Sequence, residues 1–294
     1  MTDISSKQKL FEAIRGSNGK YSMLALDQRE SLRAMFPRDE NGAPAADRQL
    51  VDFKVAGVNV LSEYASAVLL DREFGLAAPE QLRKADNAGL IVAGDFVYQD
   101  EHGGLLGSDV DPSIGAEYLQ SVGAAALKYL VIWRPGVEKA ERARQLEQTI
   151  AVAQEAGVLS LIEPIVRPDD NSNWTSVSEK HDAILRAAEE IAPYRPDIYK
   201  AEVPGYSPGD VSRVAEHSAE LSKIVDGDWV ILSNGVADSE FPTALFEAMK
   251  GGARGFLAGR AIWKDVVAEK NHAEVMAERS IGRLKELVAI TDKF

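Results

Sequence analysis

The sequence has no cysteine, only four histidines and no long hydrophobic run. The lack of cysteine excludes disulfides, thiolate nucleophiles and thiolate zinc sites, and it is compatible with a reducing compartment. No apolar stretch reaches the roughly 18 residues that a membrane-spanning helix needs, and the polar start MTDISSKQK has no signal-peptide core. We therefore expect a cytoplasmic protein.

Clusters of basic residues are also missing, and the formal net charge is -13. This charge repels nucleic acids and anionic lipids unless a basic patch is segregated, so we expect neither nucleic acid nor a membrane as a partner. The field of the whole protein would oppose an anionic small molecule as well. A few local cations and backbone N–H groups would have to hold such a substrate.

Short apolar runs bounded by Gly, Asp or Pro recur along the chain and alternate with segments of helical periodicity. Near-continuous apolar strands are typical of a parallel sheet that is covered by other elements. The runs that predict strands are 22–28, 66–71, 89–96, 126–133, 158–166, 197–203, 229–235 and 255–260.

Amphipathic helices are predicted between these strands, at 46–64, 138–156, 179–192 and 208–224. Eight strands, each followed by a crossover helix, close into a (β/α)8 TIM barrel, so we expect an α/β protein with one barrel domain over residues 1–294. Segments 1–9 and 274–294 are expected to be additions to that domain. A doubly wound open sheet is the alternative, but the first strand is followed by DQRE and not by a Gly-rich nucleotide turn.

Several charged residues lie within or directly after the apolar strands, at the end of the barrel where active sites form. Their burial implies that they pair with one another or bind a ligand. Lys200 in DIYKAEV is the most informative, because a desolvated lysine near a second cation, here Lys128, becomes a competent nucleophile toward a ketone. Alternatively, both lysines neutralise carboxylates such as Glu163 and Glu202 in a structural network.

Two carboxylates are candidates for proton transfer. Glu163 in LIEPIV stands at a strand end, where it could shuttle protons and also form a salt bridge to one of the two strand lysines. Asp27 follows the first strand and offers a second carboxylate on the opposite wall. The alternative for Asp27 is that it caps the following helix.

The last two strands end in Ser233-Asn234-Gly235 and Gly259-Arg260, at a position where barrels often bind a phosphate through backbone N–H groups and a helix start. Glycine allows close approach of the backbone, and Arg260 adds a bidentate charge. The alternative is a pair of ordinary tight turns, with Arg260 on the surface.

Metal ligands are scarce. The histidines fall in a loop or in predicted helices, and none ends a strand: His102, His181, His217 and His272. A zinc-dependent aldolase needs imidazoles that converge on the ion, and no cysteine can replace them. We therefore expect no metal and no other cofactor, and hydrolysis by a serine and a histidine is disfavoured on the same ground.

These motifs resemble those of the class I aldolase family that contains tagatose 1,6-bisphosphate aldolase, nearly from end to end. Within that family the sequence is most similar to the aldolases of 6-deoxy-6-sulfofructose 1-phosphate in sulfoquinovose degradation. The segments that carry this resemblance are MLALDQRESLRAMF, LVDFKV, YASAVLLD, LKYLVIWR, LIEPIVRP, DIYKAEVP, WVILSNGV and GFLAGRAIW. Departures from the tagatose-type pattern, at GDFVYQD, VIWRPG and EPIVRP, favour the sulfosugar.

The resemblance implies a metal-independent retro-aldol cleavage of 6-deoxy-6-sulfofructose 1-phosphate to dihydroxyacetone phosphate and 3-sulfolactaldehyde, a step of sulfoglycolysis. It implies that Lys200 forms the Schiff base, that Glu163 transfers protons, and that Lys128 is the cation that tunes the amine. Asp27 and Gln28 would line the substrate-facing first strand.

For the two ends of the substrate, the resemblance implies a site for the C1 phosphate at Ser233, Gly235, Gly259 and Arg260. Arg29 is our candidate for the sulfonate, which carries a smaller charge than phosphate and needs fewer cations. Two alternatives stay open: an aldolase of the same mechanism that acts on tagatose or fructose 1,6-bisphosphate, and a catalytically inert barrel that senses sugar phosphates. We expect a homo-oligomer.

Overall fold

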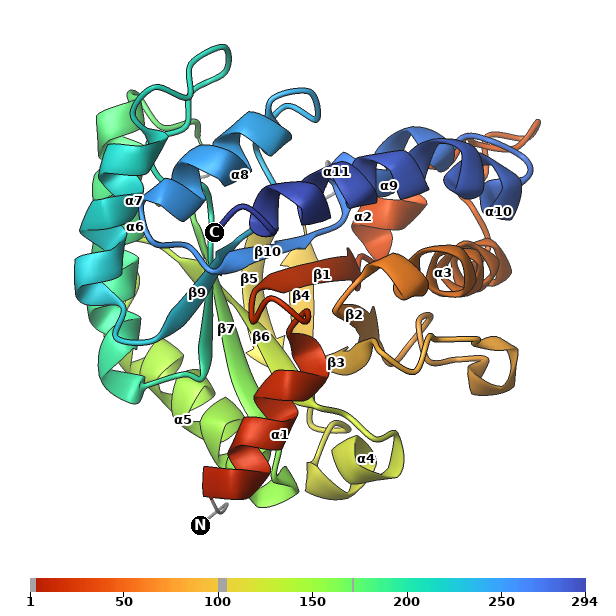
Figure 1. Cartoon of the computed structure of the whole chain (residues 1–294), viewed down its shortest axis with the longest axis horizontal. Coiled ribbons are helices and arrows are strands. Elements are labelled where there is room, and N and C mark those ends of the chain that lie inside the picture. The colour runs from red at the N-terminus through yellow and green to blue at the C-terminus, as the bar shows by residue number, and fades with distance from the viewer. Residues whose placement is uncertain (1–3, 100–104, 171) are drawn as a thin grey trace.

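A computed structural model describes residues 4–99, 105–170 and 172–294, and eight parallel strands close into a barrel (Figure 1). Around the barrel the strands are ordered β1-β10-β9-β8-β7-β6-β3-β2. The predicted TIM barrel is confirmed. The strands are β1 (Tyr21–Leu26), β2 (Ala67–Asp71), β3 (Gly89–Ala93), β6 (Ala126–Trp133), β7 (Leu159–Val166), β8 (Ile198–Ala201), β9 (Asp228–Ile231) and β10 (Gly255–Ala258).

Helices surround the barrel, with α5, α6 and α7 along one side and α3 and α10 along another (Figure 1). Among the described residues, none of these helices combines the length and apolar character that crossing a bilayer demands. The α-helices are α1 (Ile4–Ile14), α2 (Glu30–Arg33), α3 (Asp47–Leu61), α4 (Ala116–Ser121), α5 (Lys139–Ala156), α6 (Val177–Ile191), α7 (Val214–Ile224), α8 (Phe241–Lys250), α9 (Arg260–Trp263), α10 (His272–Val275) and α11 (Ile281–Thr291).

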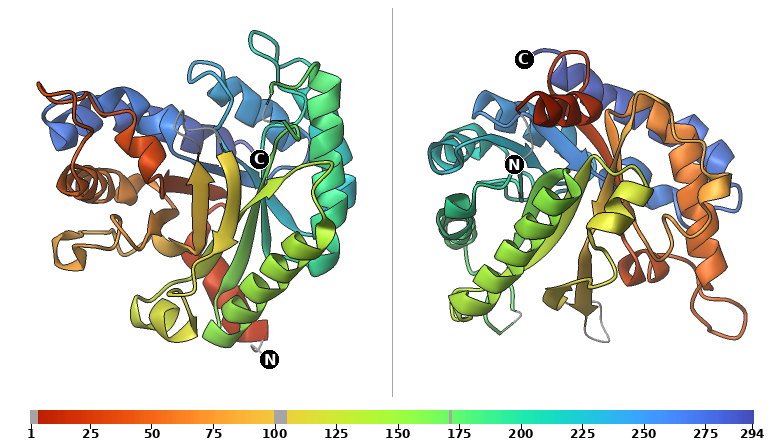
Figure 2. Two further views of the ribbon diagram at one scale, coloured as in Figure 1. Left: turned by 180° about the vertical axis from the view of Figure 1, so that it is seen from behind. Right: turned by 90° about the horizontal axis from the view of Figure 1, so that it is seen from below.

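Several predicted segments differ from the structure in their bounds; the strand predicted at 229–235, for example, ends at Ile231. The helix predicted at 208–224 begins only at Val214, because Gly209 has φ +80 and Ser207 and Asp210 pair in a tight turn before it. The strand predicted at 89–96 ends at Ala93, and the chain then turns into an antiparallel hairpin of β4 (Asp95–Gln99) and β5 (Leu105–Val110), which packs against β6 (Figure 2).

Gly94 marks the point where this hairpin leaves the barrel. A Cβ at Gly94 would lie 2.5 Å from a methyl carbon of Leu127 on β6, so a larger residue here would force the Leu127 side chain to move. The hairpin therefore projects from the carboxyl end of β3, on the side of the barrel where the candidate site lies.

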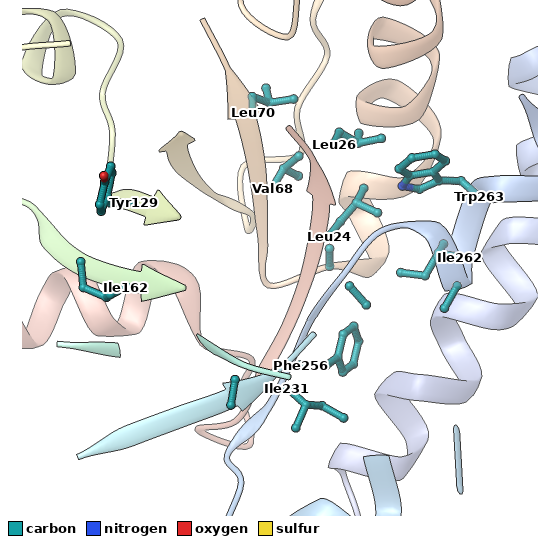
Figure 3. Close-up of a cluster of buried hydrophobic side chains, with 14 of the residues drawn as sticks. Leu24, Leu26, Val68, Leu70, Tyr129, Ile162, Ile231, Phe256, Ile262 and Trp263 are labelled. Atoms are coloured by element: carbon teal, nitrogen blue, oxygen red, sulfur yellow. The ribbon is translucent and has the colours of Figure 1, made fainter. Parts of the chain in front are cut away.

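The barrel strands bury both of their faces. Outward side chains of the strands, such as Leu24 and Leu26 of β1, belong to one apolar cluster with helix residues such as Trp263 of α9 (Figure 3). Inward side chains recur at every second residue and form a separate apolar cluster that includes Met23, Leu161 and Ile198. Helix α1 contributes Leu10, Phe11 and Ile14 to this inner cluster and so closes the floor of the barrel.

Candidate active site

Charged side chains lie directly above this apolar floor. Strand alternation places Lys128 of β6, Glu163 of β7 and Lys200 of β8 on the inward face, two residues beyond apolar inward positions. The register of β7 with β8, Leu161 opposite Ile198, continues to bring Glu163 level with Lys200. Lys128 pairs in register with Leu161, two residues before Glu163, and its long side chain reaches the same carboxylate.

Glu163 bridges the two lysines. Its Oε1 lies 2.9 Å from Lys200 Nζ, and its Oε2 lies 2.9 Å from Lys128 Nζ. All three residues are buried, with Lys128 only 1% exposed, so these ion pairs are largely shielded from water. The lysine pair and the glutamate that the sequence singled out are therefore in direct contact.

Lys128 is the centre of a larger charge cluster. Its Nζ also lies 2.9 Å from Asp27 Oδ2 and 3.1 Å from Asp95 Oδ2, and Asp95 in turn binds Arg29 Nη2 at 3.0 Å. Burial by itself would lower the pKa of Lys128, but Asp27, Asp95 and Glu163 outweigh it and raise that pKa well above its usual value. Lys128 is therefore a permanent cation.

Asp27 has the opposite balance. Burial by itself would raise the pKa of Asp27, but the charges of Lys128 and Lys200 outweigh it and hold that pKa below its usual range. Helix α2 has Arg29 as its N-cap residue, without a side-chain hydrogen bond, so Asp27 does not cap this helix. The alternative role of Asp27, as the cap of the following helix, therefore does not apply.

A cavity of about 300 Å³ opens onto the charge cluster at the carboxyl ends of the strands. Of the residues that the sequence singled out, it is lined by Asp27, Gln28, Arg29, Lys128, Glu163, Lys200, Asn234 and Arg260. Ser233, Gly235 and Gly259 do not line it. Ser233 is buried, Gly235 lies exposed at the rim with φ +78, and Gly259 packs against the backbone carbonyl of Ala25.

Arg260 and Asn234 close one end of this cavity. Arg260 begins helix α9 and donates from Nη2 to Asn234 Oδ1, which joins the ends of β9 and β10. Burial lowers the pKa of Arg260, and nearby Arg167 lowers it further. Arg260 is thus partly buried in the cavity wall, and the alternative of a surface arginine in an ordinary turn does not apply.

The sequence did not single out the hairpin residues that form the other wall, which are Phe96, Val97, Gln99 and Leu105. A signal was present, because the short runs DFVYQ and LLGSDV are separated by DEHGG, a five-residue segment with two glycines, as expected of a hairpin. The apolar run of β3 continues into DF and obscured the break at Gly94.

The alternative left open by the sequence, in which the strand lysines neutralise Glu202, does not apply, because Glu202 pairs with other groups. Its Oε2 accepts from the backbone N–H of Val166 at 2.8 Å, and its Oε1 lies 3.1 Å from Lys180 Nζ and 3.7 Å from Arg167 Nη1. Neither Arg167 nor Lys180 was a candidate from the sequence. Both lie on elements that follow β7, in a loop and in the first turn of α6.

One group among the described residues offers ligand atoms for a metal ion: His181 and His217, whose rings stack at 3.8 Å, and Glu220. These residues come from α6 and α7 and do not line the cavity. Glu220 lies 2.6 Å from His181 Nε2, and the Arg213 guanidinium occupies the position next to His217 Nε2 at 2.8 Å. The stacked rings and the adjacent guanidinium do not favour a cation there. His102 lies outside the described residues.

Residues 21–265 match the DeoC/LacD family aldolase model. Relatives include a tagatose 1,6-diphosphate aldolase of Streptococcus agalactiae, 27% identical, with 90% of this chain and 86% of the relative covered. Another, from Enterococcus faecalis, is 29% identical, with 89% and 85% covered.

Solved structures show the same fold. An archaeal fructose 1,6-bisphosphate aldolase superposes with a TM-score of 0.64 at 16% identity, covering 98% of this chain and 100% of that chain. The fructose-bisphosphate aldolase of Slackia heliotrinireducens gives 0.64 at 18% identity, covering 99% and 92%. Because the matching family is one of aldolases, the alternative of a catalytically inert barrel does not apply. This chain belongs to the DeoC/LacD family of aldolases and is a lyase.

Proposed function

We propose that this aldolase cleaves 6-deoxy-6-sulfofructose 1-phosphate to dihydroxyacetone phosphate and 3-sulfolactaldehyde, with Lys200 as the nucleophile. The observation that carries the proposal is the contact of Lys200 Nζ with Glu163 Oε1 at 2.9 Å, inside the cavity. This distance lies within the range for direct proton transfer, so Glu163 can accept a proton from the Lys200 ammonium group and leave a free amine.

The amine then attacks the C2 carbonyl, and loss of water from the carbinolamine gives a protonated imine. Glu163 takes the proton of the C4 hydroxyl as the C3–C4 bond breaks, and the electron pair of that bond moves toward the imine to form an enamine. The aldehyde leaves, the enamine is protonated at C3, and water releases dihydroxyacetone phosphate. Lys128 keeps its charge throughout and holds the Glu163 carboxylate beside the reacting groups.

Charge at the two ends of the cavity supports a sulfonate at the end opposite the phosphate. Arg29 is the cation at that end; it is already paired with Asp95, and the carboxylates of Glu30 and Glu73 also line the cavity. A phosphate carries roughly 1.5 to 2 negative charges, whereas a sulfonate carries one. A single, partly neutralised arginine therefore favours the monoanion.

The second candidate is a tagatose 1,6-bisphosphate aldolase, because that is the name of relatives that match 90% of this chain. The two candidates share the imine and differ in the distal group. Measuring kcat/KM for both sugars decides between them, and we expect the sulfosugar to be cleaved faster. Faster cleavage of tagatose 1,6-bisphosphate would assign the second function.

The shared mechanism is tested by trapping. Borohydride added with dihydroxyacetone phosphate should fix a three-carbon adduct on Lys200, identified by peptide mass. Lys200→Met should remove the adduct and abolish turnover while the protein stays folded. The adduct on Lys128, or on fully buried Lys54, would reassign the nucleophile.

A further inference from the structure

A protein with a net charge of -13 needs local cations to hold an anionic substrate. Two cations of the structure have no role in the proposed mechanism. Lys180 of α6 and Arg167 after β7 both face the carboxylate of Glu202. Glu202 is 2% exposed and stands two residues after Lys200, at the carboxyl end of β8. A buried carboxylate thus anchors two cations near the carboxyl ends of β7 and β8.

The position of Lys180 is defined by its neighbour. A Cβ built on Gly235 would lie 3.7 Å from Lys180 Nζ, so the ammonium group lies over the turn that follows β9. The same turn contains Asn234, which lines the cavity and binds Arg260. Lys180, Gly235, Asn234 and Arg260 therefore follow one another along the rim.

The turn beneath Lys180 has backbone N–H groups that are available to bind a ligand. Within the described ranges, the backbone N–H groups of Asn234 and Gly235 donate to no protein acceptor, since both residues lie beyond the end of β9 and outside any helix. Two unpaired N–H groups beside cations are the usual means by which proteins bind phosphate oxygens. Gly235, with φ +78, turns the backbone without a side chain that would cover this position.

We propose that Lys180 binds the phosphate of the substrate over the Asn234–Gly235 turn, and that Glu202 is the positioning residue that holds Lys180 there. The inference rests on the proposed function and adds two residues to it. The Lys180 ammonium has three N–H donors, of which Glu202 Oε1 takes one, so donors remain for phosphate oxygens. Arg167, held by the same carboxylate, adds positive charge on the side of Arg260.

Two three-carbon ketones separate phosphate binding from chemistry. Dihydroxyacetone phosphate and dihydroxyacetone both offer a ketone to Lys200, and only the first carries a phosphate. The ketone concentration that gives half-maximal borohydride trapping on Lys200 is measured for the wild type, Lys180→Met, Lys180→Arg and Glu202→Gln. Lys139→Met is the matched control, because Lys139 is an exposed lysine at the start of α5, another barrel helix.

We expect Lys180→Met to raise the half-maximal concentration of dihydroxyacetone phosphate about tenfold, the range for one charge-assisted hydrogen bond at a partly exposed site. The value for dihydroxyacetone should not change. Lys180→Arg should restore most of the loss, Glu202→Gln should act like Lys180→Met, and Lys139→Met should have no effect. Inorganic phosphate should compete with trapping in the wild type and more weakly in Lys180→Met.

Equal losses with both ketones would show that Lys180 only supports the fold and would overturn the inference. An unchanged value for dihydroxyacetone phosphate in Lys180→Met would overturn it as well. Failure of the imine mechanism is distinct from both results, because the wild type would then carry no adduct on Lys200 with either ketone. Failure of the sulfosugar assignment would appear only in the kcat/KM comparison and would leave the trapping results unchanged.

Discussion

Lys128 offers the sharpest test of the charge cluster, through the substitution Lys128→Met. The ammonium group contacts Asp27, Asp95 and Glu163 at 2.9, 3.1 and 2.9 Å and is 1% exposed. At an effective dielectric of about 20, each pair at this distance is worth roughly 5 kcal/mol before desolvation is counted. Its removal leaves three buried carboxylates with only Lys200 and Arg29 to balance them.

The net cost is smaller than the sum of the pairs, because the lysine no longer has to be desolvated and one carboxyl group can take up a proton. We expect Lys128→Met to lower the free energy of unfolding by about 3–5 kcal/mol at pH 7, the range for a buried ion pair that loses one partner. Denaturant unfolding measures this value. A loss below about 0.5 kcal/mol, typical of a surface position, would refute the reasoning.

The pH dependence follows from Asp27. Because the folded-state pKa of Asp27 is lowered in the wild type, its contribution to stability is present above the unfolded pKa, about 3.9, and is lost as the pH falls through the lower folded value. In Lys128→Met the main source of that contribution is gone. The stability difference between the two proteins should therefore be largest near pH 7 and shrink below about pH 4.

Lys54→Met is the matched control for the same experiment. Lys54 is fully buried and forms an ion pair with Asp71, but none of its contacts in the described chain reaches Glu163 or Lys200. We expect Lys54→Met to destabilise the fold by a similar amount and to keep borohydride trapping on Lys200. Lys128→Met should lower the stability of the fold and should also lose borohydride trapping on Lys200. Loss of trapping in both variants at a temperature where both are folded would show that Lys128 has no special effect on the amine.

Three further predictions concern catalysis, the phosphate turn and metal. Glu163→Gln should lower kcat about 10²- to 10⁴-fold in steady-state assays, because it removes the proton-transfer group, and a rate within threefold of the wild type would exclude that role. Gly235→Ala should cost about 1–2 kcal/mol in denaturant unfolding, because φ +78 is unfavourable for alanine, whereas Gly115→Ala, at φ -96 with open space around it, should cost less. Chelators should leave the aldolase rate unchanged, and a loss that zinc restores would contradict the imine mechanism.

The barrel and the centre of the site could be predicted because both depend on strand alternation. The run 126–133 was predicted with the bounds that β6 has, and inward positions on neighbouring strands must face one another. Once Lys128, Glu163 and Lys200 stood on such strands, contact among them followed from the closure of the barrel. No long-range information beyond the fold was needed.

The rim of the cavity could not be predicted in the same way. Whether Lys180 points to solvent or to Glu202 depends on where α6 begins relative to β8, which helical periodicity does not determine. The hairpin that starts at Asp95 depends on the close approach of Gly94 to Leu127, a contact between strands more than 30 residues apart in sequence. Loop and helix-start positions set the distal contacts, and a single sequence does not place them.

The charges of the site are divided between a neutral centre and a positive end, and this division explains how an acidic protein could bind an anionic sugar. At the centre, the carboxylates of Asp27, Asp95 and Glu163 face the cations Lys128, Lys200 and Arg29, so a proton can move between Lys200 and Glu163 without changing the net charge. At the Arg260 end, the cations Arg167, Lys180 and Arg260 outnumber the carboxylates of Glu202 and Asp238. If the dianionic phosphate binds at this positive end, the ketone carbon is drawn toward Lys200, and the binding energy of the anion is used to place the reacting bond beside Glu163.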